Sequence, residues 1–221
     1  MSRDLIGYGG RWPDLVWPNG ERLAVSVAVN FEEGAEPQVL DGDPTSERIG
    51  EVISVVPEGR PDPGQAQIFA YGTRAGAWRM ADALRRYAIS ATVFACGRAA
   101  ERAAPVLAML AADGHETACP SGLLVVPYAL DANDMKFFHP NGFVRAAEMV
   151  EYVTDALDVL EAEAARGLPR LLNIGFHLRI VGRPGRFKAF EGVLAELDHR
   201  RHRLWIARRI EIADAFARAS S

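Results

Sequence analysis

Cysteine is scarce in this chain, and its scarcity excludes two classes of small protein. Only Cys96 and Cys119 are present among the 221 residues. Two thiols make neither a disulfide framework nor a zinc site of four cysteines. The chain is 49% hydrophobic, so it can bury a substantial core, of a size suited to one α/β domain or two small ones.

The sequence also lacks a strong charge imbalance and any long apolar run. The 25 basic and 29 acidic residues give a net charge of −4, which argues against a nucleic-acid or anionic-membrane partner. No apolar run approaches the ~20 residues that span a bilayer. The first residues lack the basic and apolar regions of a signal peptide. We therefore expect a soluble, cytoplasmic protein.

Short apolar runs alternate with amphipathic stretches, which predicts an α/β fold. Several of the runs are apolar nearly throughout, as is typical of strands covered on both faces in a parallel sheet. A barrel and an open sheet fit this pattern equally well. The segment 37–64, rich in Pro, Gly and acidic residues, is predicted to be a long excursion over one end. Strands are expected at 23–31, 89–96, 123–130, 171–176 and 203–207, and helices at 74–88, 104–114, 143–167, 186–200 and 209–219.

Two carboxylates, Glu32 and Glu33, directly follow the first predicted strand. Sites in parallel α/β folds lie at the carboxyl ends of the strands, so this position favours a functional role. Adjacent carboxylates repel each other and raise each other's pKa, which can keep one near neutrality as a general base. The alternative interpretation is a solvated loop.

Two further strand ends carry candidate residues. His177 closes the strand at 171–176 and precedes Arg179; a histidine can serve as acid or base, and an arginine can hold a carboxylate or substrate carbonyls. The alternative there is a core histidine beside a basic surface loop. Asn133 and Asp134 follow the strand at 123–130, where such residues ordinarily form a turn by bonding their own backbone. Cys96 also follows a strand, and we interpret it as a buried apolar cysteine.

Several stretches, taken in order, resemble a known family. "NFEEG", "ATVFACGRAAER", "DGHE" and "GFHLR" resemble the motifs of the polysaccharide deacetylase (NodB-homology, carbohydrate esterase 4) superfamily. "WPNGERLAVSVAVNFEEG", "YGTRAGAWR", "VVPYALDANDMKF" and "HLRIVGRPGR" are similar to its allantoinase-like, metal-independent branch. The resemblance implies a single domain over residues 1–221, folded as a distorted (β/α) barrel that hydrolyses carbon–nitrogen bonds other than peptide bonds.

The resemblance also implies roles for individual residues. Glu32 would be the catalytic base with Glu33 beside it, and His177 the acid that protonates the leaving nitrogen. Arg179 and Asn133, with Asp134 next to them, would hold the carbonyl groups of a cyclic amide or ureide. The family's first motif reads T-F-D-D-G, and the extra methylene of each glutamate here would crowd a metal fitted to aspartate. We therefore expect no metal and no other cofactor.

The chain departs from the family in its middle. The family carries ligand histidines shortly after "GHE", but here the positions 119–122 read Cys-Pro-Ser-Gly. The sequence then runs directly into "LLVVPYAL", so that roughly two or three βα units of ~30 residues are missing. We expect a reduced barrel, with an open side as one outcome, and an open edge would need covering by another subunit. A homo-oligomer is the corresponding prediction.

Three functional hypotheses remain at this point. The first is a metal-independent hydrolase of a cyclic amide or ureide. The second is a catalytically impaired family member that serves as a binding or assembly subunit. The third is a metal-dependent deacetylase, which the sequence disfavours because carboxylates with no nearby histidine cannot build the usual three-ligand site.

Overall fold

A parallel sheet forms the centre of the computed structural model, which describes residues 5–48, 50–117 and 126–219. The described strands run in the order β3-β2-β1-β4, and β5 pairs with the first part of β1 while β2 pairs with its last part. β1 and β4 are in register from Leu23 opposite Arg170 to Asn30 opposite His177. The strands are β1 (Leu23–Phe31), β2 (Thr92–Ala95), β3 (Glu116–Thr117), β4 (Arg170–His177) and β5 (Trp205–Ile206).

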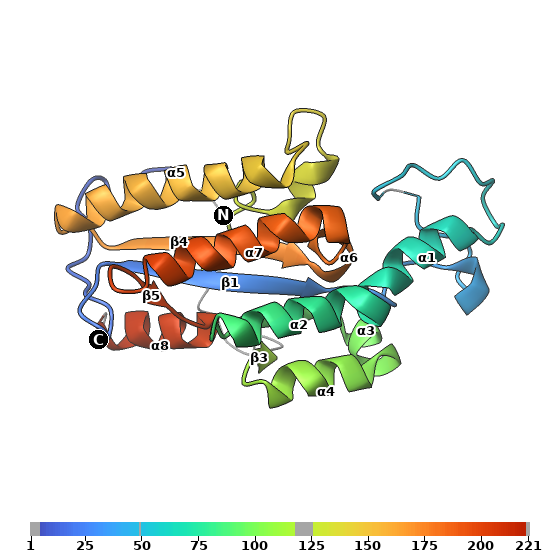
Figure 1. Ribbon diagram of the computed structural model, residues 1–221, viewed down its shortest axis with the longest axis horizontal. Helices are drawn as coiled ribbons and strands as arrows, with labels where there is room; N and C mark the ends of the chain where they lie inside the picture. The colour runs from blue at the N-terminus through green and yellow to red at the C-terminus, as the bar shows by residue number, and fades with distance from the viewer. Residues whose placement is uncertain (1–4, 49, 118–125, 220–221) are drawn as a thin grey trace.

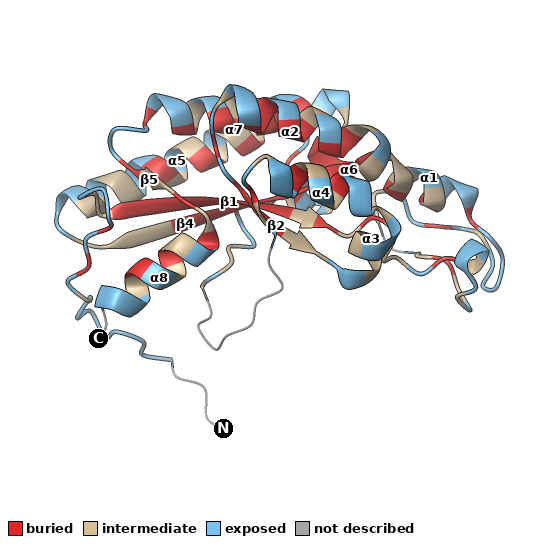
Figure 2. Ribbon diagram, turned by 90° about the horizontal axis from the view of Figure 1, so that it is seen from below, coloured by how far each residue is buried: buried red, intermediate tan, exposed pale blue. Residues whose placement is uncertain are grey.

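Helices cover the sheet unevenly on its two faces. The long helices α2, α5 and α7 lie along one face, whereas α8 lies on the other (Figures 1 and 2). The helices are α1 (Pro63–Tyr71), α2 (Ala77–Arg86), α3 (Gly97–Arg102), α4 (Ala104–Ala112), α5 (Ala146–Ala165), α6 (Leu178–Val181), α7 (Pro184–His199) and α8 (Arg209–Ala219). Three tighter or wider turns complete the set: the 3-10 turns η1 (Val39–Asp41) and η3 (Asp134–Phe138), and the π-helical turn η2 (Gly72–Gly76).

β1 is buried along almost its whole length and separates two apolar clusters. Alternate residues of a strand face opposite sides of the sheet. Val25, Val27 and Val29 accordingly belong to the main cluster under α2, α5 and α7, while Ala24 belongs to a second cluster beside α8. Because both faces are covered, nearly every residue of β1 is apolar, as the sequence predicted.

Most predicted elements are confirmed, and two predictions are wrong. The helix expected from residue 74 begins eleven residues earlier, because Pro63 takes the first helical position and Asp62 caps the N–H groups of Gly64 and Gln65. It then continues through η2 into α2. A strand was expected at 123–130, but residues 126–130 form none. Further along the chain, Asn133 makes an isolated parallel bridge with Gly175 of β4. Residues 123–125 and the Cys119–Gly122 junction lie outside the described residues.

Two glycines let the η2–α2 turn pack closely against α6. A Cβ on Gly76 would lie 2.2 Å from the carbonyl oxygen of Leu178, and a Cβ on Gly182 would lie 2.5 Å from the Cα of Gly76. Neither position therefore admits a side chain without a backbone shift. This contact holds α6, and with it Arg179, beside the carboxyl end of β1.

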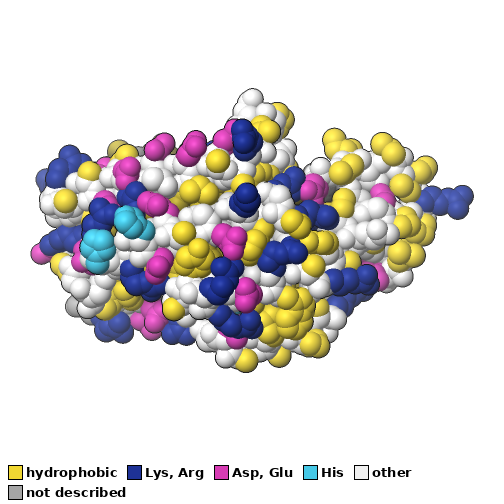
Figure 3. All heavy atoms as spheres, viewed as in Figure 1, with side chains coloured by type: hydrophobic (Ala, Val, Ile, Leu, Met, Phe, Trp, Pro, Cys, Tyr) yellow, Lys and Arg dark blue, Asp and Glu magenta, His cyan; other side chains and the backbone are white. Residues whose placement is uncertain are grey.

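The segment between β1 and α1 forms the predicted excursion at one end of the molecule. Apolar side chains are exposed on this segment, and they gather at the right-hand end of the face drawn in Figure 3. Examples are Leu40, Val52, Ile53 and Val55. None of the helices in the described ranges has the length and apolarity needed to cross a membrane.

Candidate active site

Glu32 and His177 meet at the carboxyl ends of β1 and β4. The register places Asn30 opposite His177, so that Glu32 projects from the chain just beyond the paired residues. Glu32 Oε1 lies 3.8 Å from His177 Nε2. A cavity of about 600 Å³ opens over this pair, lined by Asn30, Glu32, Tyr128, Leu130, Asn133, Met135, Lys136, Phe138, His139, Pro140 and His177.

Asp134 holds the imidazole of His177 from behind. Asp134 Oδ1 lies 2.6 Å from His177 Nδ1, and Oδ2 accepts the backbone N–H of His177 at 2.8 Å. Asp134 is completely buried, so these contacts replace its hydration. Burial alone would lower the pKa of His177, but the hydrogen bond and the charge of Asp134 raise it above its usual value. The histidine therefore keeps Nε2 toward the cavity and is protonated more readily than a free imidazole.

Arg179 holds the carboxylate of Glu32. Its Nη1 lies 2.9 Å from Glu32 Oε2 and 3.6 Å from Glu33 Oε1. The guanidinium also lies over the ring of Phe69, 4.5 Å from the centroid, in a cation–π contact. Since Oε2 is engaged by Arg179, Glu32 presents its other oxygen to His177 and the cavity.

Glu33 is buried and joins β1 to the start of α6. Its Oε1 accepts the backbone N–H of Arg179 at 2.9 Å, and its Oε2 accepts that of Glu32 at 3.1 Å. Gly72 makes room for this carboxyl, because a Cβ there would lie 2.6 Å from Glu33 Oε1. Burial raises the pKa of Glu33 to about 7, and the charge of Arg179 only partly opposes it. Burial, rather than repulsion from Glu32, is thus the physical cause of the raised pKa.

A tyrosine and an asparagine that the sequence did not single out complete the cavity wall. The Tyr128 hydroxyl accepts an N–H from Asn30 at 2.7 Å and one from Asn133 at 3.0 Å. Asn30 was detectable as the polar residue two positions before Glu32 on a strand whose face alternates. Tyr128 had no such signal, because its partner Asn30 is 98 residues away.

The structure locates the residues predicted to bind substrate and corrects one expectation, the burial of Cys96. Arg179 and Asp134 are buried, contact Glu32 and His177 respectively, and are not among the residues that line the cavity. Asn133 does line the cavity. Cys96 is exposed at the surface, not buried as expected. The part of its thiol that is removed from water, together with the nearby charges of Glu32 and Glu33, raises the pKa of the thiol, which disfavours a thiolate nucleophile.

The donor set does not fit a divalent metal. The two carboxylates share one guanidinium, Arg179, which occupies the space between them. The His177 nitrogen facing Asp134 is taken by that carboxylate. Among the described residues there is no group of three His, Cys, Asp or Glu side chains that could hold a metal ion.

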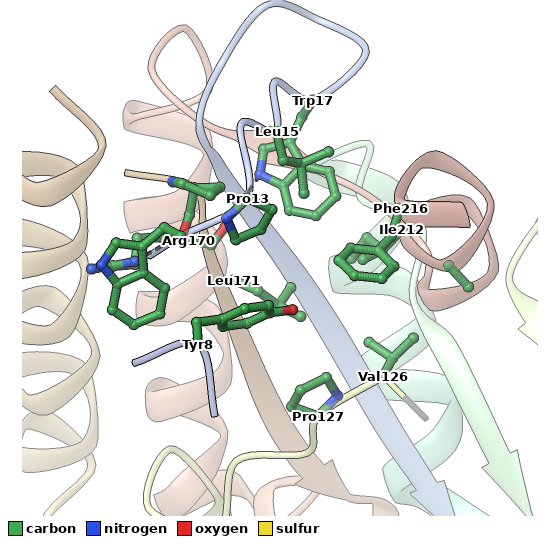
Figure 4. A pocket seen from close by; sticks show the side chains of 13 residues that line it. Tyr8, Pro13, Leu15, Trp17, Val126, Pro127, Arg170, Leu171, Ile212 and Phe216 are labelled. Carbon is green, nitrogen blue, oxygen red and sulfur yellow. Dashed lines mark hydrogen bonds between the residues drawn. The ribbon is translucent and has the colours of Figure 1, made fainter. Parts of the chain in front are cut away.

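A second cavity, of about 350 Å³, lies at the opposite, amino ends of β1 and β4. Figure 4 shows aromatic and aliphatic side chains around it, including Tyr8, Trp17 and Phe216. Among the described residues that line it, the one charged group is Arg170, which stacks on Trp12 and is paired with Glu163. The part of this cavity that the structure describes therefore offers apolar surface and no acid–base pair, unlike the cavity at the carboxyl ends.

Comparison with known proteins agrees with this fold. No family model matches the chain. A Schizosaccharomyces pombe protein whose name places it with the polysaccharide deacetylases is 26% identical, over 98% of this chain and 97% of its own. The crystal structure of a probable polysaccharide deacetylase from Pseudomonas aeruginosa PAO1 is 29% identical, covers 99% of this chain and 98% of its own, and has a TM-score of 0.90. The crystal structure of PuuE allantoinase is also 29% identical, covers 98% of this chain and 97% of its own, and has a TM-score of 0.87.

The sequence relative and the solved structures thus indicate the polysaccharide deacetylase (NodB-type) family, and the α/β fold of this chain matches that of the family's barrels. Within that family it is similar to an allantoinase-type hydrolase. The alignment with the yeast relative runs over 311 positions, whereas this chain has 221 residues, a difference of 90. At least 90 positions of the alignment are therefore gaps in this chain, which supports the predicted loss of a segment.

Proposed function

We propose that this protein is a metal-independent hydrolase of a carbon–nitrogen bond in a cyclic amide or ureide. The observation that carries the proposal is the Glu32–His177 pair, 3.8 Å apart on one cavity, with each member fixed by a buried partner. A general base and a general acid must lie within hydrogen-bond reach of the same substrate, directly or through one water. The likeness to an allantoinase supports a cyclic ureide as the substrate class.

The proposed reaction has two steps. Glu32 takes a proton from water while the water oxygen bonds to the carbonyl carbon, and the C=O electron pair moves onto the carbonyl oxygen. That pair then re-forms the C=O bond, the carbon–nitrogen bond breaks, and His177 gives the nitrogen a proton. The proton that Glu32 accepted then passes to His177, directly or through solvent, which restores both groups. One water is consumed: its hydroxyl remains on carbon and the balance of one proton is on nitrogen, so that the ring opens to an acid and an amine, amide or urea.

Arg179 and Asp134 prepare the two reacting groups in different ways. The guanidinium of Arg179 holds Oε2 of Glu32 at 2.9 Å and so fixes the direction in which its other oxygen points. Asp134 raises the pKa of His177 and so favours the protonated form, which is the form that can donate a proton. One buried partner thus orients the proposed base, and the other keeps the proposed acid protonated.

Hydrolysis assays in the presence of EDTA test the proposal. We expect turnover of allantoin, a hydantoin or succinimide that EDTA does not reduce. Glu32→Gln and His177→Ala should each lower kcat by about 10²–10⁴, the usual contribution of general acid–base catalysis. Glu101→Gln, which changes an exposed glutamate of α3, is the matched control and should keep full activity. Wild-type protein that is no faster than the Glu32 and His177 variants on all these compounds would contradict the proposal.

A second candidate is a family member that binds such compounds without turning them over, as a binding or assembly subunit. The alignment with the Schizosaccharomyces pombe relative, which spans 311 positions against the 221 residues of this chain, favours it, because this chain lacks residues that the relative has. Ligand binding measured by calorimetry, with no product in the same sample, would distinguish it from the hydrolase.

A further inference from the structure

Two asparagine amides near the cavity have their orientations fixed by the backbone. Asn30 Nδ2 donates to the carbonyl oxygen of Phe176 at 3.1 Å, so this end of the amide must be the NH₂ group. Asn133 Oδ1 accepts the N–H of Met135 at 2.8 Å, which leaves its Nδ2 as the free donor. Both NH₂ groups then point at one atom, the hydroxyl oxygen of Tyr128.

The Tyr128 hydroxyl consequently still has its own proton to donate in a hydrogen bond. A hydroxyl has two acceptor positions and one proton to donate. Asn30 and Asn133 occupy both acceptor positions, at 2.7 Å and 3.0 Å. The proton cannot be given back to either amide donor, and Tyr128 lines the cavity that contains Glu32 and His177. The O–H group is therefore an oriented donor at the cavity wall.

We propose that Tyr128 is a catalytic residue whose hydroxyl donates a hydrogen bond to the scissile carbonyl oxygen of a cyclic amide or ureide. This inference rests on the proposed hydrolase function and specifies how the site stabilises negative charge. When water adds to the carbonyl carbon, the electron pair moves onto that oxygen, and the tyrosine hydrogen bond strengthens without any proton leaving Tyr128. A donor already held in place before charge develops is the arrangement that stabilises such a transition state.

The strand beneath Tyr128 is shaped to admit this arrangement. A Cβ on Gly175 would lie 2.5 Å from the Tyr128 oxygen and 2.2 Å from Asn133 Nδ2. The absence of a side chain at this one position of β4 thus lets the phenol and the amide meet. Burial also raises the pKa of Tyr128, which keeps the hydroxyl protonated, and hence a donor, at neutral pH.

The test compares Tyr128→Phe with wild type on a cyclic imide and on its thiocarbonyl analogue. Removing the donor should lower kcat on the oxygen substrate by about 10²–10³, as for loss of one oxyanion donor. Sulfur is a weak acceptor, so the ratio of the oxygen rate to the sulfur rate should fall at least tenfold in the variant. Structural damage would lower both rates alike and leave this ratio unchanged, an outcome that would overturn the proposal.

Two controls separate this proposal from the proposed function. Tyr152→Phe removes a hydroxyl that donates to Asp131 at 2.8 Å and does not line the cavity, so its rate ratio should equal that of wild type. Binding of the same imide, measured by calorimetry, should weaken at least fivefold in Tyr128→Phe even if no turnover occurs. Wild-type protein that binds the imide without turnover would refute the proposed hydrolysis but not the role of Tyr128. Equal affinities of wild type and Tyr128→Phe for the imide would refute the role of Tyr128. Wild-type protein that neither binds nor hydrolyses the imide would refute both proposals.

Discussion

Glu32 and Glu33 are neighbours in sequence and identical in chemistry, yet they occupy opposite environments. The Glu32 side chain is 38% exposed at the cavity, whereas that of Glu33 is 1% exposed under Gly72. Burial raises the pKa of Glu33 to about 7, and its oxygens accept two backbone N–H groups. The proposed role of Glu32 as proton acceptor and the structural role of Glu33 therefore follow from position and not from residue type.

This difference predicts how stability depends on pH. Between pH 4.5 and 7 the folded protein holds a proton on Glu33 that the unfolded chain releases, so the free energy of unfolding falls as pH rises through this window. The loss is about 3 kcal/mol if Glu33 acts alone. Glu33→Gln should flatten the slope, as measured by denaturant unfolding from pH 4.5 to 7.5. An equal slope in Glu33→Gln and wild type would show that another group is responsible.

His177 adds a slope of the same sign at higher pH. Its folded pKa is raised by Asp134, so the stabilisation is complete below the usual histidine pKa and is lost as pH rises through the folded value. Asp134→Asn should remove this part of the pH dependence and lower kcat together. NMR titration of the His177 ring would show the pKa directly, and a value unchanged by Asp134→Asn would contradict the assigned pairing.

The roles of single residues were predictable only in part. Glu32 and His177 follow strands, and the end of a parallel sheet brings such residues together. The inward position of Asp134 could not be predicted, because η3 turns its side chain toward His177 and sequence spacing contains no information on that direction. Tyr128 was missed because its environment is built from strands far away in sequence.

At the scale of elements, the contact between the η2–α2 turn and α6 sets the position of Arg179. The π-helical turn is a wide turn of the kind that often occurs near functional sites. Because Gly76 has no Cβ, the backbone of the η2–α2 turn can approach the backbone of α6 closely. The arginine that orients Glu32 thus depends on a glycine more than a hundred residues earlier in the chain.

Gly76→Ala should therefore damage stability and activity together. Its Cβ would meet the Leu178 carbonyl at 2.2 Å, a backbone atom that cannot rotate away, so we expect a loss of about 1–3 kcal/mol or more. Displacement of α6 should also lower kcat. Gly185→Ala in α7 meets no atom within 4 Å and is the matched control, which should be neutral or slightly stabilising. Thermal melts and initial rates of both variants check this, and equal behaviour would argue against the close contact.

The elements themselves were predicted well where periodicity decides them. α5 and α7 carry apolar stripes and end near Gly167 and Arg200, close to the expected bounds. α1 was not predicted, because the apolar residues of "PGQAQIFAY" are spread around the helix and form no single face. Its start is decided by a local interaction, the Asp62 cap, and not by periodicity.

At the scale of the whole molecule, the two apolar clusters share β1 and should unfold together. The second cluster contains Trp17 stacked on Trp205, with ring centroids 5.7 Å apart, while the main cluster holds most of the helices. In a Trp12→Phe, Trp78→Phe background these two tryptophans report the second cluster alone. We expect their fluorescence and the far-UV circular dichroism to change at the same denaturant concentration. A fluorescence transition at lower denaturant would show that the second cluster is an independent unit.

The central position of β1 has a consequence for amide hydrogen exchange. The strand is hydrogen-bonded on both edges, by β4 on one side and by β5 and β2 on the other. Amides in such a strand open only when the whole molecule opens, whereas surface segments open locally. Asn30 lies in, and Glu32 directly follows, the strand that we expect to exchange most slowly, so fluctuations of the excursion should leave the spacing of the proposed base and acid unchanged.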